Sequence, residues 1–329
     1  MFTRPNELSD ADIVRAVADG WGLRATSVDW APVGFGSHHW HVRSDGERWF
    51  VSVDDLDTRL RHRSDDRSGA AMRLTDALAT ARALRDSGLD FVIAPTPART
   101  GTIVHRIDNR YVAALYDHVD GTTHRWGAYP TDAERSAVLE RITAIHAVPA
   151  KRAPAARRDD FLIPRRDELM ETLSDALAAW GPGPFAEPAR TLLHDHHDAL
   201  RHVLGRYDLL VKEVAARPDR WVLTHGEPHR GNTIDTAHGV VLIDWDTALL
   251  APPERDLWTL IDEDAGVAGE YSERTGTPID PVAIELYRLW WDLCEISLYA
   301  ADFRRPHEET DDTQVAWAKL QICVDPERW

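Results

Sequence analysis

The most informative stretch of this sequence is "HGEPHRGN", His225–Asn232, followed by "TIDTAHGVVLIDWD", residues 233–246. His225 and His229 have the i, i+4 spacing that would place two imidazoles on one face of a zinc-binding helix. Pro228 lies inside that helix, where it would remove a hydrogen bond and cost about 3 kcal/mol. Gly226 also stands where the zinc-protease motif has a glutamate. We therefore interpret the stretch as a loop and not as a metal-binding helix.

The residues around this loop have strand character. "VLT" precedes it, and "NTIDT" and "VVLI" follow it, with Gly239 in the turn of a predicted hairpin. The hairpin would bring Asn232 and Asp244 together, although twelve positions separate them. The carboxylate of Glu227 would then lie close to the amide of Asn232 and the carboxylate of Asp244. Phosphoryl transfer requires such a set, namely a group that orients the attacking hydroxyl and hard oxygen ligands for Mg²⁺.

Composition limits the classes of partner. The chain has 329 residues, 43% hydrophobic and 28% charged, as in a soluble globular protein of one large or two ordinary domains. No apolar run approaches the ~20 residues that span a bilayer, and the first residues show no signal-peptide pattern. Two cysteines, Cys294 and Cys323, favour a reducing cytoplasm. The net charge of −17 argues against nucleic acid or a membrane surface as partner and suits a cationic small molecule.

The first part of the chain is predicted to be rich in β-structure. A short helix ending at Gly20 precedes alternating apolar and polar residues, with "SDGE" (44–47) as a hairpin turn. A long helix is expected over "AAMRLTDALATARALRDSG", residues 70–88. The histidines at 38, 39 and 41 are expected to face solvent from a strand, not to bind a metal. The predicted strands are Ser27–Val33, Trp40–Val42, Arg48–Val53, Gly101–Arg106 and Arg110–Tyr116.

The second part is predicted to be mainly helical. "DHVDGTT", Asp117–Thr123, has the composition of a hinge, and one helix is expected over residues 132–148. Two more helices are expected between Asp167 and Val214, separated at "GPGP", and further helices follow the strands near residue 240. We therefore predict an α+β chain of two lobes, with residues 1–118 as a small antiparallel-sheet lobe and residues 119–329 as a larger helical lobe.

"HGEPHRGN", followed by "LIDWD" and "PERDL" (253–257), resembles the aminoglycoside phosphotransferases and the related choline and small-molecule kinases. Their pattern is H-G-D-x-H-x-x-N followed by I-D. The order of the two lobes matches as well, so the resemblance covers most of the chain. It implies a protein-kinase-like fold, ATP or GTP as phosphoryl donor, and Mg²⁺. It places Glu227 at the catalytic-base position and makes Asn232 and Asp244 magnesium ligands. The remaining residues would brace or position the loop: His225, His229 and Asp256.

The nucleotide side departs from the family pattern. "VGFGSHHW", Val33–Trp40, corresponds to the loop over the phosphates, and the hinge backbone is expected to hold the adenine. Strand alternation puts Ser52 where the family has a phosphate-binding lysine, and the first 150 residues contain no lysine. Either an arginine binds the phosphates in place of the lysine, or backbone amides, Ser37 and the metal bind them without it. The candidate arginines are Arg43, Arg59, Arg73 and Arg106. The predicted nucleotide-binding residues are Gly34, Gly36, Ser37, Ser52, Asp117 and Val119.

Glu227 is the second departure, because the family pattern has aspartate there. The extra methylene moves the carboxylate by about 1.5 Å, and a misplacement near 1 Å can cost on the order of 10²-fold in rate. Pro228 could reset the loop, and a loose transition state needs little early proton abstraction. A catalytically weakened or inactive kinase-fold binding protein is therefore an alternative to a working kinase.

The acceptor is expected on a helix near the C-terminus, "IELYRLWWDLCEISLYAADFRR", residues 284–305. Its apolar stripe is Leu286, Leu289, Leu293, Ile296 and Ala300. An acidic row runs beside this stripe, and in the resembling family such residues often hold acceptor amines; the alternative is a solvated acidic face. We expect transfer to a hydroxyl of an amine-bearing acceptor, with an aminoglycoside or aminocyclitol favoured over a sugar or choline-like metabolite. The predicted substrate residues are Asp262, Glu263, Trp291, Asp292, Glu295 and Asp302.

Overall fold

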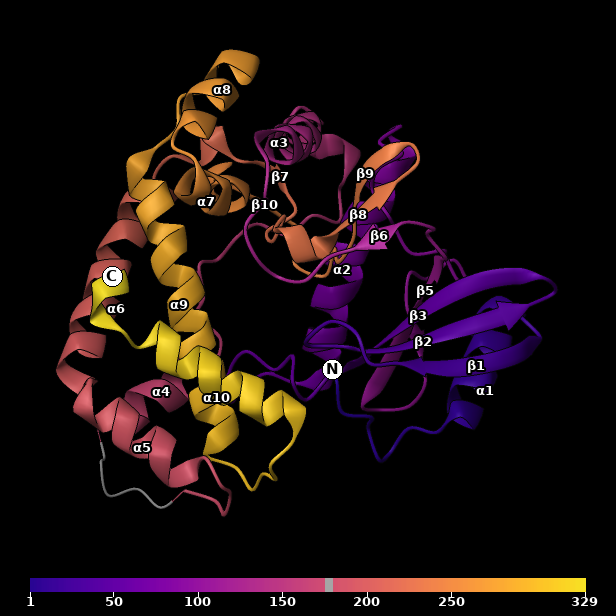
Figure 1. Cartoon of the computed structure of the whole chain (residues 1–329), viewed down its shortest axis with the longest axis horizontal. Helices are drawn as coiled ribbons and strands as arrows, with labels where there is room; N and C mark the ends of the chain where they lie inside the picture. Colours follow the sequence, from indigo (N-terminus) through magenta and orange to yellow (C-terminus); the bar gives the residue numbers. More distant parts are fainter. Residues whose placement is uncertain (175–179) are drawn as a thin grey trace.

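The computed structural model describes residues 1–174 and 180–329, in which a five-stranded antiparallel sheet stands beside a larger helical region (Figure 1). The strand order in the sheet is β1-β2-β3-β5-β4. Its central hairpin turns at Asp45 and Gly46, whose φ values of 51° and 85° are those that a two-residue type I′ turn requires. The strands are β1 Ala25–Ala31, β2 His38–Ser44, β3 Glu47–Asp55, β4 His105–Arg106 and β5 Tyr111–Asp117.

Along β5 both faces of this sheet are buried, each against a different helix. Along β5, Tyr111, Ala113 and Leu115 pack in the cluster on the α1 (Asp10–Trp21) side. Val112 and Ala114 belong to the cluster formed with α2 (Arg67–Asp86). A strand covered on both faces has no polar side to present to water, and this explains the continuous apolar run in β5.

The α2 cluster also joins the sheet to the rest of the chain. It contains Leu223, Leu242 and Trp245, which flank the predicted catalytic hairpin. The segment just after α2 pairs with that hairpin directly: Ile93 N donates to Leu242 O at 3.0 Å, and Leu242 N donates to Phe91 O at 2.8 Å. The boundary between residues 118 and 119 stays a prediction, but the two regions share this core.

Two small sheets carry the predicted catalytic stretch. Strand β8 is the centre of the order β6-β8-β9, and its register with β9 pairs Thr233 with Leu242. Strand β6 belongs to the hinge, so the segment that connects the two regions is paired with the β8–β9 hairpin. These strands are β6 Thr122–Thr123, β7 Val222–Thr224, β8 Thr233–Thr236, β9 Gly239–Leu242 and β10 Leu249–Ala251, with β7 paired to β10.

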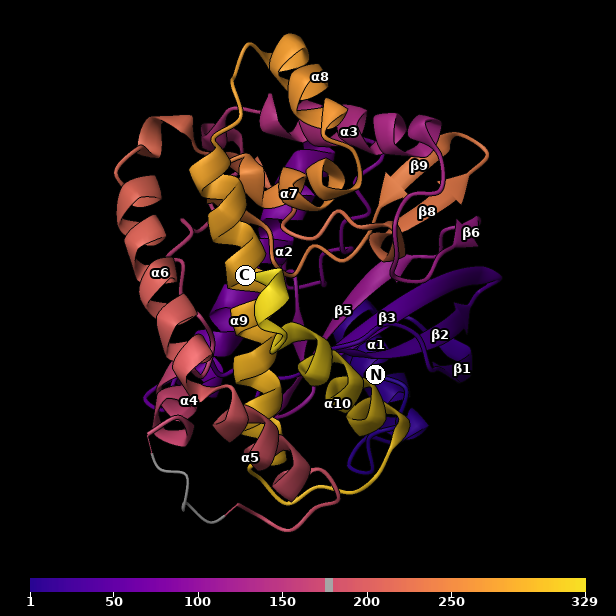
Figure 2. The same ribbon diagram turned by 60° about the vertical axis from the view of Figure 1, so that its left-hand side comes forward.

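Helix α9 (Pro281–Phe303) lies at the centre of the helical region, and α10 crosses between it and the sheet (Figure 2). The predicted apolar stripe of α9 is confirmed, because none of its five residues is more than 2% exposed. The other helices are α3 Asp132–His146, α4 Arg166–Thr172, α5 Ala186–Asp195, α6 His197–Ala215, α7 Glu254–Glu263, α8 Gly266–Thr275 and α10 Asp311–Cys323. Short 3₁₀ turns occupy Ala150–Arg152, Pro218–Arg220, Arg230–Asn232 and Pro326–Arg328.

Some local predictions were wrong. The first helix continues past Gly20 to Trp21 and is capped by Gly22 in the left-handed region. The strand expected at Gly101–Arg106 is reduced to His105–Arg106, because Ala98 N bonds to Thr102 O in a tight turn. His38 does not face solvent but is buried against Trp30.

The helices expected between Asp167 and Val214 also differ, since the described part of this segment holds three, α4, α5 and α6. The backbone of His196 (φ −105°, ψ 11°) breaks the second predicted helix into α5 and α6. The first predicted helix extends over residues 175–179, which lie outside the described residues. The α+β class is confirmed. Within the described ranges, no helix combines the length and apolarity that a membrane span needs.

Candidate active site

The stretch from His225 to Asn232 is a loop between β7 and β8, closed by a 3₁₀ turn at Arg230–Asn232. Gly226 has φ 103°, a conformation that L-residues with a side chain rarely adopt. The prediction of a loop in place of a helix is therefore confirmed.

The carboxylate of Asp256, on α7, fixes the start of the loop. Its Oδ1 accepts the N–H of Gly226 at 2.6 Å, and its Oδ2 accepts the N–H of His225 at 2.9 Å. His146 Nε2 lies 3.1 Å from Oδ2. Burial opposes ionisation, but the hydrogen bond and charge of His146 outweigh it and lower the pKa of Asp256. A charged, fully buried acceptor thus orients two consecutive backbone N–H groups.

His225 connects the loop to the segment that carries Asp244. Its Nδ1 accepts the N–H of Glu227 at 3.2 Å, so the ring proton belongs on Nε2, which donates to Ile243 O at 2.8 Å. Burial lowers the pKa of His225, in agreement with this neutral tautomer. The ring packs 4.4 Å from Trp245, centroid to centroid. The side chain therefore holds two backbone segments in register.

Gly226 lies directly over the buried guanidinium of Arg255. A Cβ at position 226 would come within 2.4 Å of Arg255 Nη1. That guanidinium is held in place because Nη1 donates to Thr224 Oγ1 at 2.9 Å. The glycine is required both for its left-handed backbone and for this close approach.

Glu227, Asn232 and Asp244 are brought to one end of the β8–β9 hairpin. Ile243 N donates to Asn232 O at 3.0 Å, and Asn232 Nδ2 donates to Glu227 O at 3.0 Å. That second bond orients the amide and leaves its Oδ1 for another partner. Asp244 is solvent-accessible and has φ 65°, a conformation that a non-glycine residue adopts at a cost. Desolvation of the carboxylate by the surrounding protein, together with the negative charges of Asp246 and Glu227, raises the pKa of Asp244. The carboxylate of Glu227 lies 3.8 Å from His229 Nε2.

An arginine bridges this hairpin to the sheet. Arg59 Nη2 donates to Asp54 Oδ1 and to Asp246 Oδ2, each at 2.5 Å. Asp54 Oδ1 also accepts Ser37 Oγ at 2.6 Å, so the glycine loop joins the same network. Sequence reasoning named Arg59 among four arginines but missed Asp54 and Asp246. Strand alternation could have found Asp54, because it shares a face of β3 with Ser52.

The other three candidate arginines do not take part in this bridge. Arg73 pairs with Asp65, whereas Arg43 and Arg106 are exposed on β2 and β4.

The glycine loop connects β1 to β2 as expected. Gly34 and Gly36 have φ values of 71° and 104°, and Phe35 between them is 41% exposed. Ser37 is fixed by its bond to Asp54, and Ser52 lies opposite His39 and Ala114 in the sheet register.

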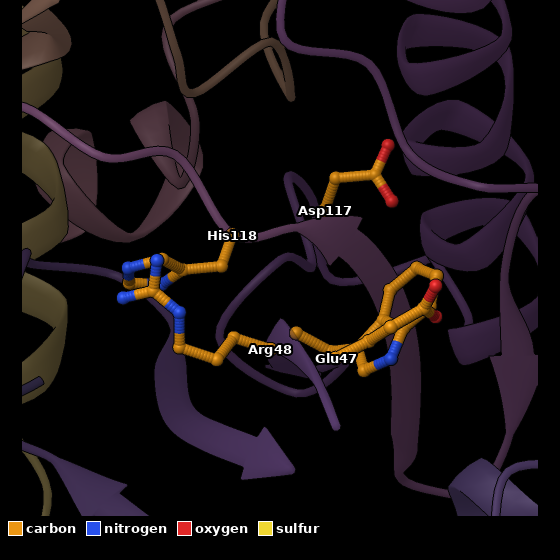
Figure 3. Close-up of a pocket in the computed structure, with 5 residues that line it drawn as sticks. Glu47, Arg48, Asp117 and His118 are labelled. Atoms are coloured by element: carbon orange, nitrogen blue, oxygen red, sulfur yellow. The ribbon is translucent and has the colours of Figure 1, made fainter. Parts of the chain in front are cut away.

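At the hinge, Asp117 lines a pocket of about 270 Å³ with Glu47, Arg48, Trp49 and His118. Arg48 and His118 extend to the same side of this pocket, and the carboxylate of Asp117 points away from them (Figure 3). Val119 follows this pocket in the chain, half-buried. A second pocket of about 530 Å³ lies between residues 160–170 and α6. The catalytic loop lines neither of these two pockets.

Of the six predicted substrate residues, the structure brings two near the loop. The ring of Trp126 lies 3.9 Å from that of His229 and stacks on Trp291 at 5.1 Å. Lys319 Nζ lies 5.6 Å from the centre of the Trp126 ring and 3.3 Å from Glu295 Oε2. Trp291 and Glu295 therefore belong to one aromatic and acidic group beside the loop, whose member Trp126 sequence reasoning missed.

The remaining four substrate candidates lie elsewhere. Asp292 is buried and paired with Arg328 at 2.9 Å, so it is not part of a solvated row. Glu263 accepts the N–H of Tyr129 at 3.0 Å, and burial raises its pKa. The others bind arginines on the surface: Asp262 to Arg288, and Asp302 to Arg305.

Residues 32–290 match the phosphotransferase enzyme family. The chain belongs to this family. Protein StrN of Streptomyces griseus is 32% identical to this phosphotransferase over 244 residues, which are 72% of each chain.

Solved structures share the fold. Spectinomycin phosphotransferase APH(9)-Ia, in complex with ADP and spectinomycin, aligns with a TM-score of 0.71 at 15% identity over 98% of this chain and 100% of its own. Choline kinase LicA from Streptococcus pneumoniae aligns with a TM-score of 0.56 at 14% identity over 95% and 97%. Amicoumacin kinase hAmiN aligns with a TM-score of 0.56 at 12% identity over 96% and 93%. The phosphotransferase therefore has the predicted protein-kinase-like fold.

The close approach of Gly226 to Arg255 predicts the effect of a single methyl group. Gly88 is a matched control, because its φ is also positive (96°) but nothing lies within 4 Å of its Cβ position. We expect Gly226→Ala to lower the free energy of unfolding by at least about 2 kcal/mol more than Gly88→Ala, since it adds a clash to the same backbone strain. Urea unfolding measures the difference. Equal losses in the two variants would contradict the account of the loop.

Proposed function

We propose that this phosphotransferase moves the γ-phosphoryl group of ATP or GTP to a hydroxyl of a polar, amine-bearing small molecule. The observation that carries the proposal is the convergence of Glu227, Asn232 and Asp244 at the end of the β8–β9 hairpin. The loop is held by a buried carboxylate and a neutral histidine, so these groups are positioned before a substrate arrives. Such preorganisation is what phosphoryl transfer needs from a protein.

The residues present fit a magnesium ion. In the described ranges no three His, Cys, Asp or Glu side chains form a cluster that would hold a metal by themselves. Mg²⁺ ordinarily binds one or two carboxylates together with substrate phosphates, so Asp244 and the Oδ1 of Asn232 suffice. The raised pKa of Asp244 also reflects negative charge that a divalent cation would offset. Bound Mg²⁺ would neutralise charge on the transferring phosphoryl group.

We assign the following roles to the loop residues. Glu227 orients the acceptor hydroxyl and accepts its proton, and His229, 3.8 Å away, positions that carboxylate. His225 and Asp256 brace the loop and exchange no proton with the substrate. Gly34 and Gly36 let the backbone N–H groups of the glycine loop approach the phosphates, and the hinge at Val119 would hold the adenine.

The aromatic and acidic group beside the loop supports an amine-bearing acceptor. Trp126, next to His229, and Trp291, stacked on Trp126, offer ring faces, and Glu295, bound to Lys319, adds a carboxylate to the group. Lys319 places an ammonium near the Trp126 face, which shows that this ring attracts a cation, and an acceptor ammonium would bind there in place of Lys319. Spectinomycin, an acceptor in a solved structure of the same fold, makes aminocyclitols the first class to test.

A binding protein without transfer activity is the second candidate, favoured by Glu227 and by the missing strand lysine. Purified protein incubated with Mg–ATP or Mg–GTP decides between the two. The panel should contain aminocyclitols, aminoglycosides, choline and neutral sugars. We expect ADP or GDP release together with the mass of one added phosphoryl group on an amine-bearing acceptor. Nucleotide binding without transfer to any acceptor would favour the binding protein, and phosphorylation of choline or sugars alone would favour a metabolic kinase.

Asp244 gives a mutational test of the metal assignment. Asp244→Asn removes a charge from a solvent-accessible position, so we expect the melting temperature to change little. Turnover should fall on the order of 10²-fold or more, because the Mg²⁺ ligand is lost. Asp235→Asn is the matched control, an aspartate on the same hairpin that pairs with His124 on the surface. Full activity in Asp244→Asn, or equal losses in both variants, would refute the assignment.

A further inference from the structure

The ion pair that positions nucleotide phosphates in protein kinases joins a lysine on the third strand to a glutamate on the following helix. Neither residue is present at its usual place in this chain. Ser52 occupies the strand position, and α2 contains no glutamate. The two aspartates inside α2 are already paired, Asp76 with Arg157 and Asp86 with Arg82. A side-chain cation for the phosphates, if one is used, therefore comes from another element.

Arg59 is a side-chain cation that lies between the glycine loop and the hairpin. Its Nη2 contacts Asp54 and Asp246 and lies 3.4 Å from Ser37 Oγ, while its Nε donates to Asp54 at 2.8 Å. Its hydrogen bonds within the described residues use only Nε and Nη2. The two N–H groups of Nη1 are thus left for another acceptor. The side chain is 21% exposed, so it can be reached by a ligand.

The segment that carries Arg59 is itself held in place. Thr58 Oγ1 donates to Asp55 O at 2.8 Å, and Arg73 Nη2 donates to Arg59 O at 3.1 Å. With Asp54 and Asp246 on the side chain, both the backbone and the guanidinium have a defined position. A cation fixed in advance loses little conformational entropy when it binds an anion.

The carboxylates in this region favour a cation, so a phosphate would be bound there together with the metal and the Arg59 guanidinium. Arg59 Nη2 contacts the carboxylates of both Asp54 and Asp246. A planar guanidinium binds phosphate oxygens in pairs, a geometry that an ammonium lacks.

We propose that Arg59 replaces the strand lysine and that its guanidinium, anchored by Asp54 and Asp246, binds the phosphates of the nucleotide below the glycine loop. Asp54 takes the place of the helix glutamate. This inference rests on the proposed nucleotide-dependent transfer, and it specifies which residue of this chain binds the phosphates.

Calorimetric titration with ATP and with adenosine, both in the presence of Mg²⁺, tests the inference without relying on turnover. Arg59→Met should lose about ten- to hundredfold in ATP affinity, the effect of one charge-assisted contact. Its adenosine affinity should stay that of the unmutated protein. Arg67→Met is the matched control: it removes a guanidinium at the start of α2 that hydrogen-bonds to Asp57, and both affinities should be unchanged. An unchanged ratio of ATP to adenosine affinity in Arg59→Met would overturn the inference.

Two further variants keep the test decisive if Arg59→Met fails to fold, because that change leaves two aspartates without their partner. Arg59→Lys keeps the charge and should fold, with an ATP affinity below that of the unmutated protein and an unchanged adenosine affinity. Ser52→Lys combined with Arg59→Lys keeps a partner for the two aspartates, adds a cation on the strand and should recover part of the ATP affinity. Unmutated ATP affinity in Arg59→Lys, with no gain from Ser52→Lys, would reject the inference.

The result for the unmutated protein separates the two proposals. If it binds neither ATP nor GTP, the proposed function fails. If it binds ATP and every Arg59 variant keeps the same preference for ATP over adenosine, only the role of Arg59 fails.

Discussion

The buried carboxylate of Asp256 is the interaction on which the candidate active site depends. It accepts two consecutive N–H groups from His225 and Gly226, and so it sets the left-handed backbone at Gly226. That backbone lies over the Arg255 guanidinium with no room for a side chain. Because an unpaired buried carboxylate is strongly unfavourable, the loop has few alternatives to this geometry. His225 then transmits the position of the loop to Ile243, next to Asp244.

The two regions of the chain meet at this site through two kinds of contact. The α2 cluster supplies an apolar core that includes Leu242 and Trp245 from the hairpin. The Ser37–Asp54–Arg59–Asp246 network supplies polar contacts at the edge of that core. The apolar packing fixes the distance between the glycine loop and the hairpin, and the hydrogen-bonded network places charged side chains between them. Strand alternation in β3 and β5 contributes to both, because it sends alternate side chains to opposite helices and places Asp54 on the face of Ser52.

Local features were predictable from the sequence because their causes are local. Pro228 and Gly226 excluded a helix, Gly239 indicated the hairpin, and 3.6-residue periodicity gave the buried stripe of α9. The predicted acidic row on α9 shows the limit of this reasoning. Helical spacing gives residues that share a face, but it does not say what covers that face. Arg328, 36 positions further on, covers Asp292, and Glu295 binds Lys319, whose Nζ lies 5.6 Å from the centre of the Trp126 ring. Likewise, the bond between Arg59 and Asp246 joins residues 187 positions apart, and no local pattern encodes such a pair.

The claim to be tested is that this chain is a phosphotransferase that binds the nucleotide phosphates with an arginine. A crystal structure with Mg²⁺ and a non-hydrolysable ATP analogue is its most direct test. The account predicts a phosphate oxygen within about 2.7–3.2 Å of the Arg59 guanidinium, with Asp54 and Asp246 still bonded to it and with Asn232 and Asp244 beside the metal. Phosphates bound only by the glycine-loop backbone and the metal, with Arg59 contacting the two aspartates alone, would contradict it.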